Sequence, residues 1–221
     1  MTQAAKAVLF DLDGTLIDSA PDLAAAGNEM RVARGLDPLP YEVFRPMVGS
    51  GARGMVAIAL EASPTHPDYE ALRSEFLDRY ALRMTHETVV FPDVGPLLER
   101  LKTAGVPCGI VTNKATRFAE PLIRALDLEH AVSALVCGDT TPHSKPHPEP
   151  LLEAARRLQV EPAFCVYVGD DLRDVQAGQA AGMMTVISAW GYLGTGEPID
   201  RWGADHIIAT PGELLKLLSM A

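Results

Sequence analysis

Short runs of apolar residues recur along the chain, and each run ends in a polar or glycine-containing loop. Continuous apolar runs of this length are typical of strands that are buried on both faces of a sheet. Because the runs alternate with helical patterns, they predict a parallel sheet that is covered by helices on both sides. The predicted strands cover residues 7–10, 106–111, 134–137, 164–168, 184–187 and 206–208.

Amphipathic patterns lie between these runs. Leu97, Leu98 and Leu101 recur at helical spacing, and Gly105 is a plausible end of that helix. We therefore expect an α/β fold with a Rossmann-like parallel-sheet core. The predicted core helices cover residues 94–104, 115–126, 150–158 and 174–181.

The segment from residue 19 to residue 84 interrupts this alternation, because it contains helix-like stretches and no convincing strand. A helical insertion directly after the first strand indicates a lid over the sheet. We predict an α/β catalytic core made of residues 1–18 and 85–221 and an α-helical cap made of residues 19–84. Within the cap, the predicted helices cover residues 23–34, 41–48, 53–60 and 69–83.

Composition narrows the functional classes. The 221 residues include 19 Lys and Arg against 29 Asp and Glu, a net charge of -10. This charge opposes binding to nucleic acid and to anionic lipid. No apolar run reaches membrane-spanning length and no signal peptide is evident, so we expect a cytoplasmic protein. Cys108, Cys137 and Cys165 form no CxxC pair and are interpreted as small core residues in a reducing compartment.

The strongest chemical signal is the DLDGT sequence of residues 11–15, directly after the first predicted strand. In parallel α/β sheets, ligands bind outside the carboxyl ends of the strands. Asp11 and Asp13 are two residues apart, so in an extended segment both can face one pocket. A calcium loop would need Gly at its sixth position and Glu at its twelfth. Counted from Asp11, those positions hold Leu16 and Asp22.

Other polar groups follow other predicted strands. The Thr112 hydroxyl and nearby backbone N–H groups could hold phosphate oxygens, although Thr112 could also cap the next helix. Lys145 lies in a loop that proline makes stiff. Asp170 and Asp174 lie in a GDDLRD sequence, whose oxygens suit a hard cation. Asp174 could instead cap the following helix.

Taken together, DLDGT, VTN, SKP and GDDLRD, with a helical insertion after the first of them, resemble the haloacid dehalogenase superfamily of phosphatases over nearly the whole chain. VTNK at 111–114, KPHPEP at 145–150 and Gly191-Tyr192 look like the phosphoglycolate phosphatase group. Other sequences are similar to the subgroup that dephosphorylates N-acetylmuramic acid 6-phosphate, namely GAR at 51–53, RFAEP at 117–121, DDLRD at 170–174 and WGAD at 202–205.

The resemblance implies a mechanism. Asp11 is the expected nucleophile, which forms an aspartyl-phosphate intermediate, and Asp13 is the expected general acid and base. The expected cofactor is Mg²⁺, held by Asp11, the backbone carbonyl of Asp13 and Asp170, with Asp174 in support. The substrate is expected to be a small phosphorylated metabolite, and the residues expected to bind it are Thr112, Asn113, Lys145 and Arg53.

Arg53 follows two glycines in the cap, at Gly49 and Gly51, and could bind an anionic group of the substrate. An exposed arginine on a turn between helices is the alternative. Lys114 and Arg117 follow the second motif and are further candidates for substrate binding.

Other functional classes share parts of this pattern. A sugar phosphomutase or phosphotransferase would use the same machinery but return the phosphoryl group to a sugar. A dehalogenase needs neither an acid for an alcohol nor magnesium, so Asp13 and Asp170 argue against it. A receiver-type phospho-acceptor module is much shorter and lacks the insertion. Among phosphatase substrates, 2-phosphoglycolate and N-acetylmuramic acid 6-phosphate both remain open, with a slight preference for the sugar phosphate.

Overall fold

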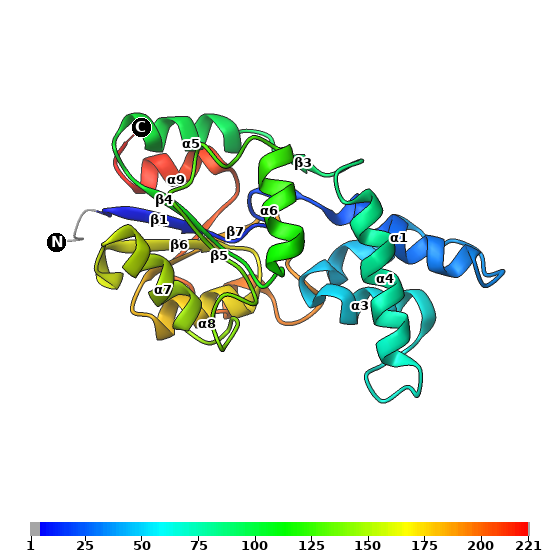
Figure 1. Ribbon diagram of the computed structural model, residues 1–221. Helices are drawn as coiled ribbons and strands as arrows, with labels where there is room; N and C mark the ends of the chain where they lie inside the picture. The colour runs from blue at the N-terminus through cyan, green and yellow to red at the C-terminus, as the bar shows by residue number, and fades with distance from the viewer. Residues whose placement is uncertain (1–4, 221) are drawn as a thin grey trace.

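The computed structural model describes residues 5–220, and its core is a sheet of six parallel strands in the order β5-β4-β1-β6-β7-β8 (Figure 1). The α/β prediction is confirmed. Strand β4 begins at Cys108 rather than at residue 106, because Pro107 has no N–H to donate to a neighbouring strand. The strands are β1 (Ala7–Phe10), β4 (Cys108–Val111), β5 (Ala134–Val136), β6 (Cys165–Gly169), β7 (Met184–Ser188) and β8 (His206–Ile208).

Helices cover both faces of the sheet, as the unbroken apolar runs predict. Side chains alternate between the faces along β1. Val8 and Phe10 pack in the cluster that includes α5, α6 and α9, whereas Ala7 and Leu9 pack with α7 and α8. Figure 1 shows α5 and α9 on one side of the sheet and α7 and α8 on the other. The core helices are α5 (Val94–Thr103), α6 (Thr116–Ala125), α7 (Glu149–Leu158), α8 (Leu172–Ala180) and α9 (Pro211–Leu217), with short 3₁₀-helices at Pro162–Phe164 and Ile199–Arg201.

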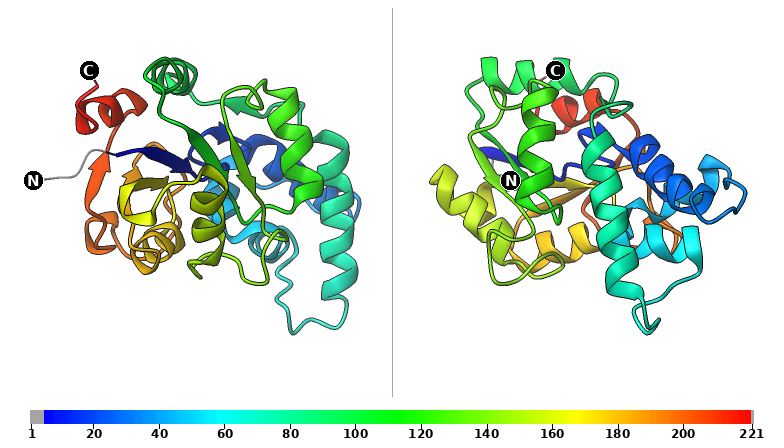
Figure 2. Two further views of the ribbon diagram at one scale, coloured as in Figure 1. Left: turned by 60° about the vertical axis from the view of Figure 1, so that its left-hand side comes forward. Right: turned by 45° about the vertical axis from the view of Figure 1, so that its right-hand side comes forward.

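The segment between β1 and α5 forms a separate group of helices at the carboxyl end of the sheet (Figures 1 and 2). These helices enclose their own apolar cluster, which includes Met30, Phe44, Met55 and Phe76. The predicted helix over 41–48 is a short α-helix followed by a 3₁₀-helix, because Pro46 cannot donate an intrahelical hydrogen bond. The elements are α1 (Ala20–Val32), α2 (Tyr41–Phe44), the 3₁₀-helix Arg45–Ser50, α3 (Gly51–Leu60) and α4 (Tyr69–Arg83).

The two chain segments that join this helical group to the core run side by side. They form a small antiparallel pair, β2 (Ile17–Asp18) with β3 (Val89–Val90). Beside it, the buried Asp22 carboxylate accepts hydrogen bonds from the backbone N–H groups of Glu87 (3.0 Å) and Thr88 (2.9 Å) and from the Thr88 hydroxyl (2.8 Å). These bonds hold the two connections together. Strands of two residues have no periodicity, so the sequence pattern did not predict them.

No helix among residues 5–220 combines the length and the apolar character that crossing a membrane requires.

Candidate active site

A cavity of about 400 Å³ lies between the carboxyl ends of the core strands and the inserted helices. The 3₁₀-helix Arg45–Ser50 and the helices α3 and α4 line it from one side, and loops of the core line it from the other. Every residue that the sequence analysis assigned to phosphate or metal binding lies along this cavity: Asp11, Asp13, Thr112, Asn113, Lys145, Asp170 and Asp174.

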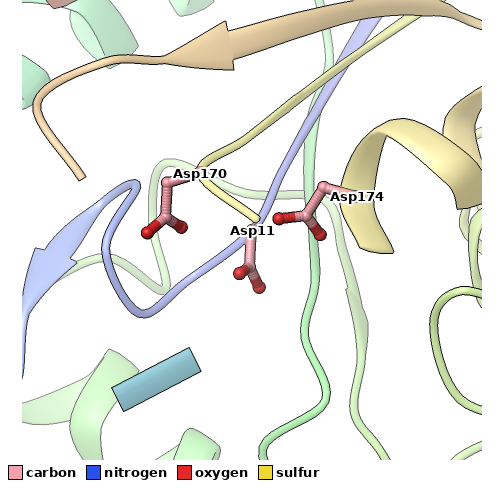
Figure 3. Close-up of side chains that lie close together, drawn as sticks. All are labelled: Asp11, Asp170 and Asp174. Carbon is pink, nitrogen blue, oxygen red and sulfur yellow. The ribbon is translucent and has the colours of Figure 1, made fainter. Parts of the chain in front are cut away.

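The register of the sheet brings the first and last motifs together. Phe10 of β1 is paired with Val168 of the neighbouring strand β6, so Asp11 and Asp170 leave adjacent strand ends. Figure 3 shows their carboxylates beside that of Asp174, which belongs to α8. One carboxylate oxygen from each of the three residues lies within 4.8 Å of the others. We refer to Asp11, Asp170 and Asp174 as the acidic cluster.

Asp170 lies in a tight cradle and is 3% exposed. Its Oδ1 accepts a hydrogen bond from the Thr15 hydroxyl at 3.2 Å, and its Oδ2 accepts one from the Tyr192 backbone N–H at 2.7 Å. A Cβ atom on Gly14 or on Gly191 would overlap the Asp170 side chain. Both positions therefore require glycine, and the chain around them fixes the direction of this carboxylate.

Asp174 caps the following helix, as one of the two interpretations of the sequence predicted, and its carboxylate also lies in the acidic cluster. Asp171 is the N-cap of α8, and the Asp174 Oδ2 accepts the Asp171 backbone N–H at 3.1 Å, which completes a capping box. The Asp174 Oδ1 accepts a hydrogen bond from the Tyr167 hydroxyl at 3.0 Å. A Cβ atom at Gly169 would overlap the Asp174 side chain. Capping thus holds this carboxylate in the acidic cluster.

Lys145 is the cation of the acidic cluster. Its Nζ lies 2.8 Å from Asp11 Oδ1 and 2.7 Å from Asp174 Oδ1, and it donates to the Tyr167 hydroxyl at 2.7 Å. Tyr167 is buried on β6 and was not predicted as a site residue. Its one sequence signal was its place in the strand that leads to Asp170.

Asn113 holds the Lys145 loop in place. Its Nδ2 donates to the Lys145 backbone carbonyl at 2.9 Å, and its Oδ1 accepts the Lys145 backbone N–H at 2.9 Å. The Asn113 amide therefore makes its contacts with the protein backbone. Thr112 is buried, and its hydroxyl accepts the Lys114 backbone N–H at 3.1 Å.

The acidic cluster carries unusual electrostatics. Burial raises the pKa of Asp11 to about 7, with Lys145 opposing this shift and Asp174 adding to it. Burial, together with Asp11 and Asp174, also raises the pKa of Asp170 well above its ordinary value. Burial alone would lower the pKa of Lys145, but Asp11 and Asp174 raise it to about 12. Three clustered carboxylates, of which two contact the single ammonium group, favour the binding of a further cation.

Asp13 contacts residues outside the acidic cluster. Its Oδ1 lies 3.0 Å from Lys114 Nζ and accepts a hydrogen bond from the Ser19 hydroxyl. Lys114 also lies over the ring of Tyr80 on α4, with Nζ 4.8 Å from the ring centroid. Burial opposes the charge on Lys114, but Asp13 and Tyr80 outweigh it and raise the pKa of Lys114.

A contact that the sequence did not predict joins the helical insertion to the core. The Arg173 guanidinium pairs with the Asp171 carboxylate at 2.7 Å and donates to the Gly49 backbone carbonyl. A Cβ atom on Gly49 would collide with Asp171 Oδ2. Gly49 is therefore needed for close approach.

Arg53 does not join the other predicted residues. It is exposed on α3 and does not line the cavity, whereas its neighbours Gly51 and Ala52 do. Arg117 at the start of α6 and Arg73 on α4 do line it.

Parallel-sheet order, the inserted helices and the acidic cluster define a family. The model of the haloacid dehalogenase-like hydrolases matches residues 5–182, and the chain belongs to this family. The resemblance drawn from the motifs is confirmed.

Two relatives have names that state an activity. The chain is 43% identical to N-acetylmuramic acid 6-phosphate phosphatase of Pseudomonas aeruginosa, over 98% of this chain and 96% of the relative. It is 45% identical to phosphoglycolate phosphatase of Xanthomonas campestris, over 95% and 94%. A crystal structure of a predicted phosphoglycolate phosphatase from Haemophilus somnus superposes with a TM-score of 0.86 at 28% identity, over 98% of this chain and 99% of the other.

Proposed function

We propose that this protein is a Mg²⁺-dependent phosphomonoester hydrolase that acts on a small phosphorylated metabolite through an aspartyl-phosphate on Asp11. The observation that carries the proposal is the acidic cluster, whose carboxylate oxygens lie within 4.8 Å of one another beside Lys145. The phosphatase names of both relatives support the reaction class. The family match leaves the receiver-type alternative without support.

The residues present fit a hard divalent cation. Magnesium prefers oxygen ligands, and the acidic cluster offers several in a rigid arrangement. Lys145 lies 2.8 Å from Asp11 Oδ1 as an ion pair, yet no described residue gives that buried oxygen a well-aligned hydrogen bond. We propose Asp11, Asp170 and the Asp13 backbone carbonyl as ligands, with Asp174 in support. When bound, Mg²⁺ supplies positive charge that lets an anionic phosphate approach the carboxylates.

In the first proposed step, an Asp11 carboxylate oxygen attacks phosphorus and the bond from phosphorus to the ester oxygen breaks. The Asp13 carboxyl gives its proton to the departing alkoxide, which leaves as an alcohol. Thr112 and Lys145 hold the phosphoryl oxygens, and Lys145 offsets their charge. Asn113 contributes by fixing the Lys145 loop.

In the second proposed step, water attacks the phosphorus of the acyl phosphate and the bond from phosphorus to the Asp11 oxygen breaks. The Asp13 carboxylate takes a proton from that water, which releases inorganic phosphate and restores both side chains. Asp13 lies two residues after Asp11, near enough to contribute to the raised pKa of Asp11, and it pairs with Lys114 at 3.0 Å. It is therefore close to where the leaving group departs, as both proton transfers require.

We propose that residues 19–84 act as a cap that closes the cavity and selects the substrate. The cavity of about 400 Å³ lies within the range of pockets that hold drug-sized ligands. This volume favours a sugar phosphate such as N-acetylmuramic acid 6-phosphate over the much smaller 2-phosphoglycolate. We also propose a cytoplasmic location, because the three cysteine thiols are free and buried.

Phosphate release from a panel of phosphorylated metabolites, compared by kcat/KM, tests the proposal. We expect turnover in Mg²⁺, its loss in EDTA, and its recovery when Mg²⁺ is restored. Full activity in a metal-free preparation would contradict the metal assignment. Phosphorus NMR that found the phosphoryl group on a second sugar rather than in inorganic phosphate would identify a phosphotransferase instead.

A further inference from the structure

The part of the cavity beyond Asp13 contains polar groups that phosphoryl transfer does not use. Tyr80 on α4 lines the cavity and is 2% exposed, and its hydroxyl has no hydrogen-bond partner among the described residues. A buried hydroxyl without a partner costs free energy, so such a group in a cavity commonly meets a ligand. Burial also raises the pKa of Tyr80 to about 12, so the hydroxyl keeps its proton and can donate it.

Lys114 lies over the ring that carries this hydroxyl, and Arg117 lies beside the neighbouring ring of Phe118. Lys114 Nζ is 4.8 Å from the centroid of the Tyr80 ring and uses one of its three donors on Asp13. Arg117 also lines the cavity, and its guanidinium lies 4.5 Å from the ring of Phe118. Among residues 5–220, no carboxylate pairs with Arg117. The ring of Phe118 in turn packs against Tyr80, with centroids 5.5 Å apart.

These contacts form one continuous surface. Tyr80, Phe118 and Phe76 provide an aromatic wall, and Lys114 and Arg117 lie against that wall. A guanidinium and a phenol together suit a planar anion such as a carboxylate. Their place beyond Asp13, away from the acidic cluster, corresponds to the alcohol part of a phosphate ester.

We propose that Tyr80, Lys114 and Arg117 form a second anion subsite that binds a carboxylate in the leaving group of the substrate. This inference rests on the proposed phosphatase function and narrows it to phosphate esters of hydroxy acids. The substrates in the names of both relatives, 2-phosphoglycolate and N-acetylmuramic acid 6-phosphate, each carry a carboxylate. A shared subsite would explain why relatives named for either substrate are similar to this chain.

The test compares phosphate esters with and without the group that carries the carboxylate. N-acetylmuramic acid 6-phosphate and N-acetylglucosamine 6-phosphate differ by the lactyl group, and 2-phosphoglycolate is matched with 2-hydroxyethyl phosphate. Binding is measured by calorimetry in the Asp11→Asn variant with Mg²⁺, so that turnover does not interfere. In at least one pair, we expect the ester with the carboxylate to bind about 10-fold or more tightly than the ester without it.

Variants locate the subsite. Arg117→Gln and Tyr80→Phe, each combined with Asp11→Asn, should reduce that preference several-fold. The affinity for the ester without a carboxylate should stay unchanged. Arg124→Gln is the matched control, because Arg124 lies on the same helix, is 73% exposed and pairs with Glu129 at 3.7 Å outside the cavity. Binding of N-acetylmuramic acid 6-phosphate could depend on Arg117 and binding of 2-phosphoglycolate on Lys114 and Tyr80. In that case the subsite holds the two carboxylates at different positions.

Failure of this inference differs from failure of the proposed function. Equal affinity for the esters with and without a carboxylate in both pairs would overturn the proposed subsite, even if wild-type protein hydrolyses all four esters. An acid preference that survives in Arg117→Gln, Tyr80→Phe and Lys114→Met would also overturn it. Tight acid binding without phosphate release by the wild-type protein would support the subsite and reject the phosphatase function.

Discussion

The two ends of the cavity differ in how firmly the fold holds their side chains. At the acidic cluster, the carboxylates of Asp170 and Asp174 are almost fully buried and rest against glycines that leave no room for any other residue. At the cap end, Arg117 is exposed, and helices of the insertion supply part of the wall. We therefore expect the chemistry to depend on rigid strand ends, and substrate selection to depend on helices that are joined to the core by two short connections.

The strongest test of the rigid end is Asp11→Asn. We expect phosphate release to fall about 10⁴-fold or more, because the amide cannot act as the nucleophile. The fold should remain intact, since the substitution keeps the shape of the side chain. Stopped assays of phosphate release, with circular dichroism as the check on folding, measure both effects. Substantial turnover by a folded variant would remove Asp11 as the nucleophile.

Gly191→Ala tests whether the tight packing around Asp170 matters when every proposed metal ligand is retained. The new Cβ would overlap Asp170, so the backbone or the carboxylate must move. Overpacking of this kind typically costs about 1–3 kcal/mol of unfolding free energy. We expect activity to fall about 10- to 100-fold, with a higher Mg²⁺ concentration needed for half-maximal rate. Gly196→Ala, where a Cβ meets nothing within 4 Å, is the control.

Arg173→Ala tests the contact that joins the helical insertion to the core. It removes the bond to the Gly49 carbonyl and the ion pair with Asp171. Because Arg173 is partly exposed, we expect a modest effect, a rise in KM of about 3- to 10-fold. Arg156→Ala, which breaks an exposed ion pair with Glu153 on α7, should leave KM unchanged. Equal kinetics for both variants would show that this contact does not hold the cap.

The smallest effect is expected for Arg53→Ala. Its side chain is exposed and lies outside the residues that line the cavity. We expect kcat/KM to stay within about twofold of the wild-type value, as is usual for surface substitutions. A loss of 10-fold or more would mean that the cap moves Arg53 to the substrate during turnover, and would restore the role suggested by the sequence.

The sequence by itself determined the strand ends and the residues that follow them. Unbroken apolar runs require burial on both faces, so β1 and β6 and the positions of Asp11 and Asp170 could be predicted from the pattern alone. That these two strands are neighbours comes from the register of the sheet. Local patterns sufficed for these positions because a buried strand and the residue that follows it are adjacent in sequence.

Only the tertiary structure decided which side chains meet in and around the cavity. Tyr80 gives no signal in the sequence, whereas Tyr167 and Arg173 are marked only by a place in a strand and in a motif. Each of the three contacts a partner that is remote along the chain. Arg53 is the opposite case, because the sequence suggested it for substrate binding but its side chain does not line the cavity. Periodicity determines whether a residue is buried, but packing between the cap and the core determines what that residue contacts.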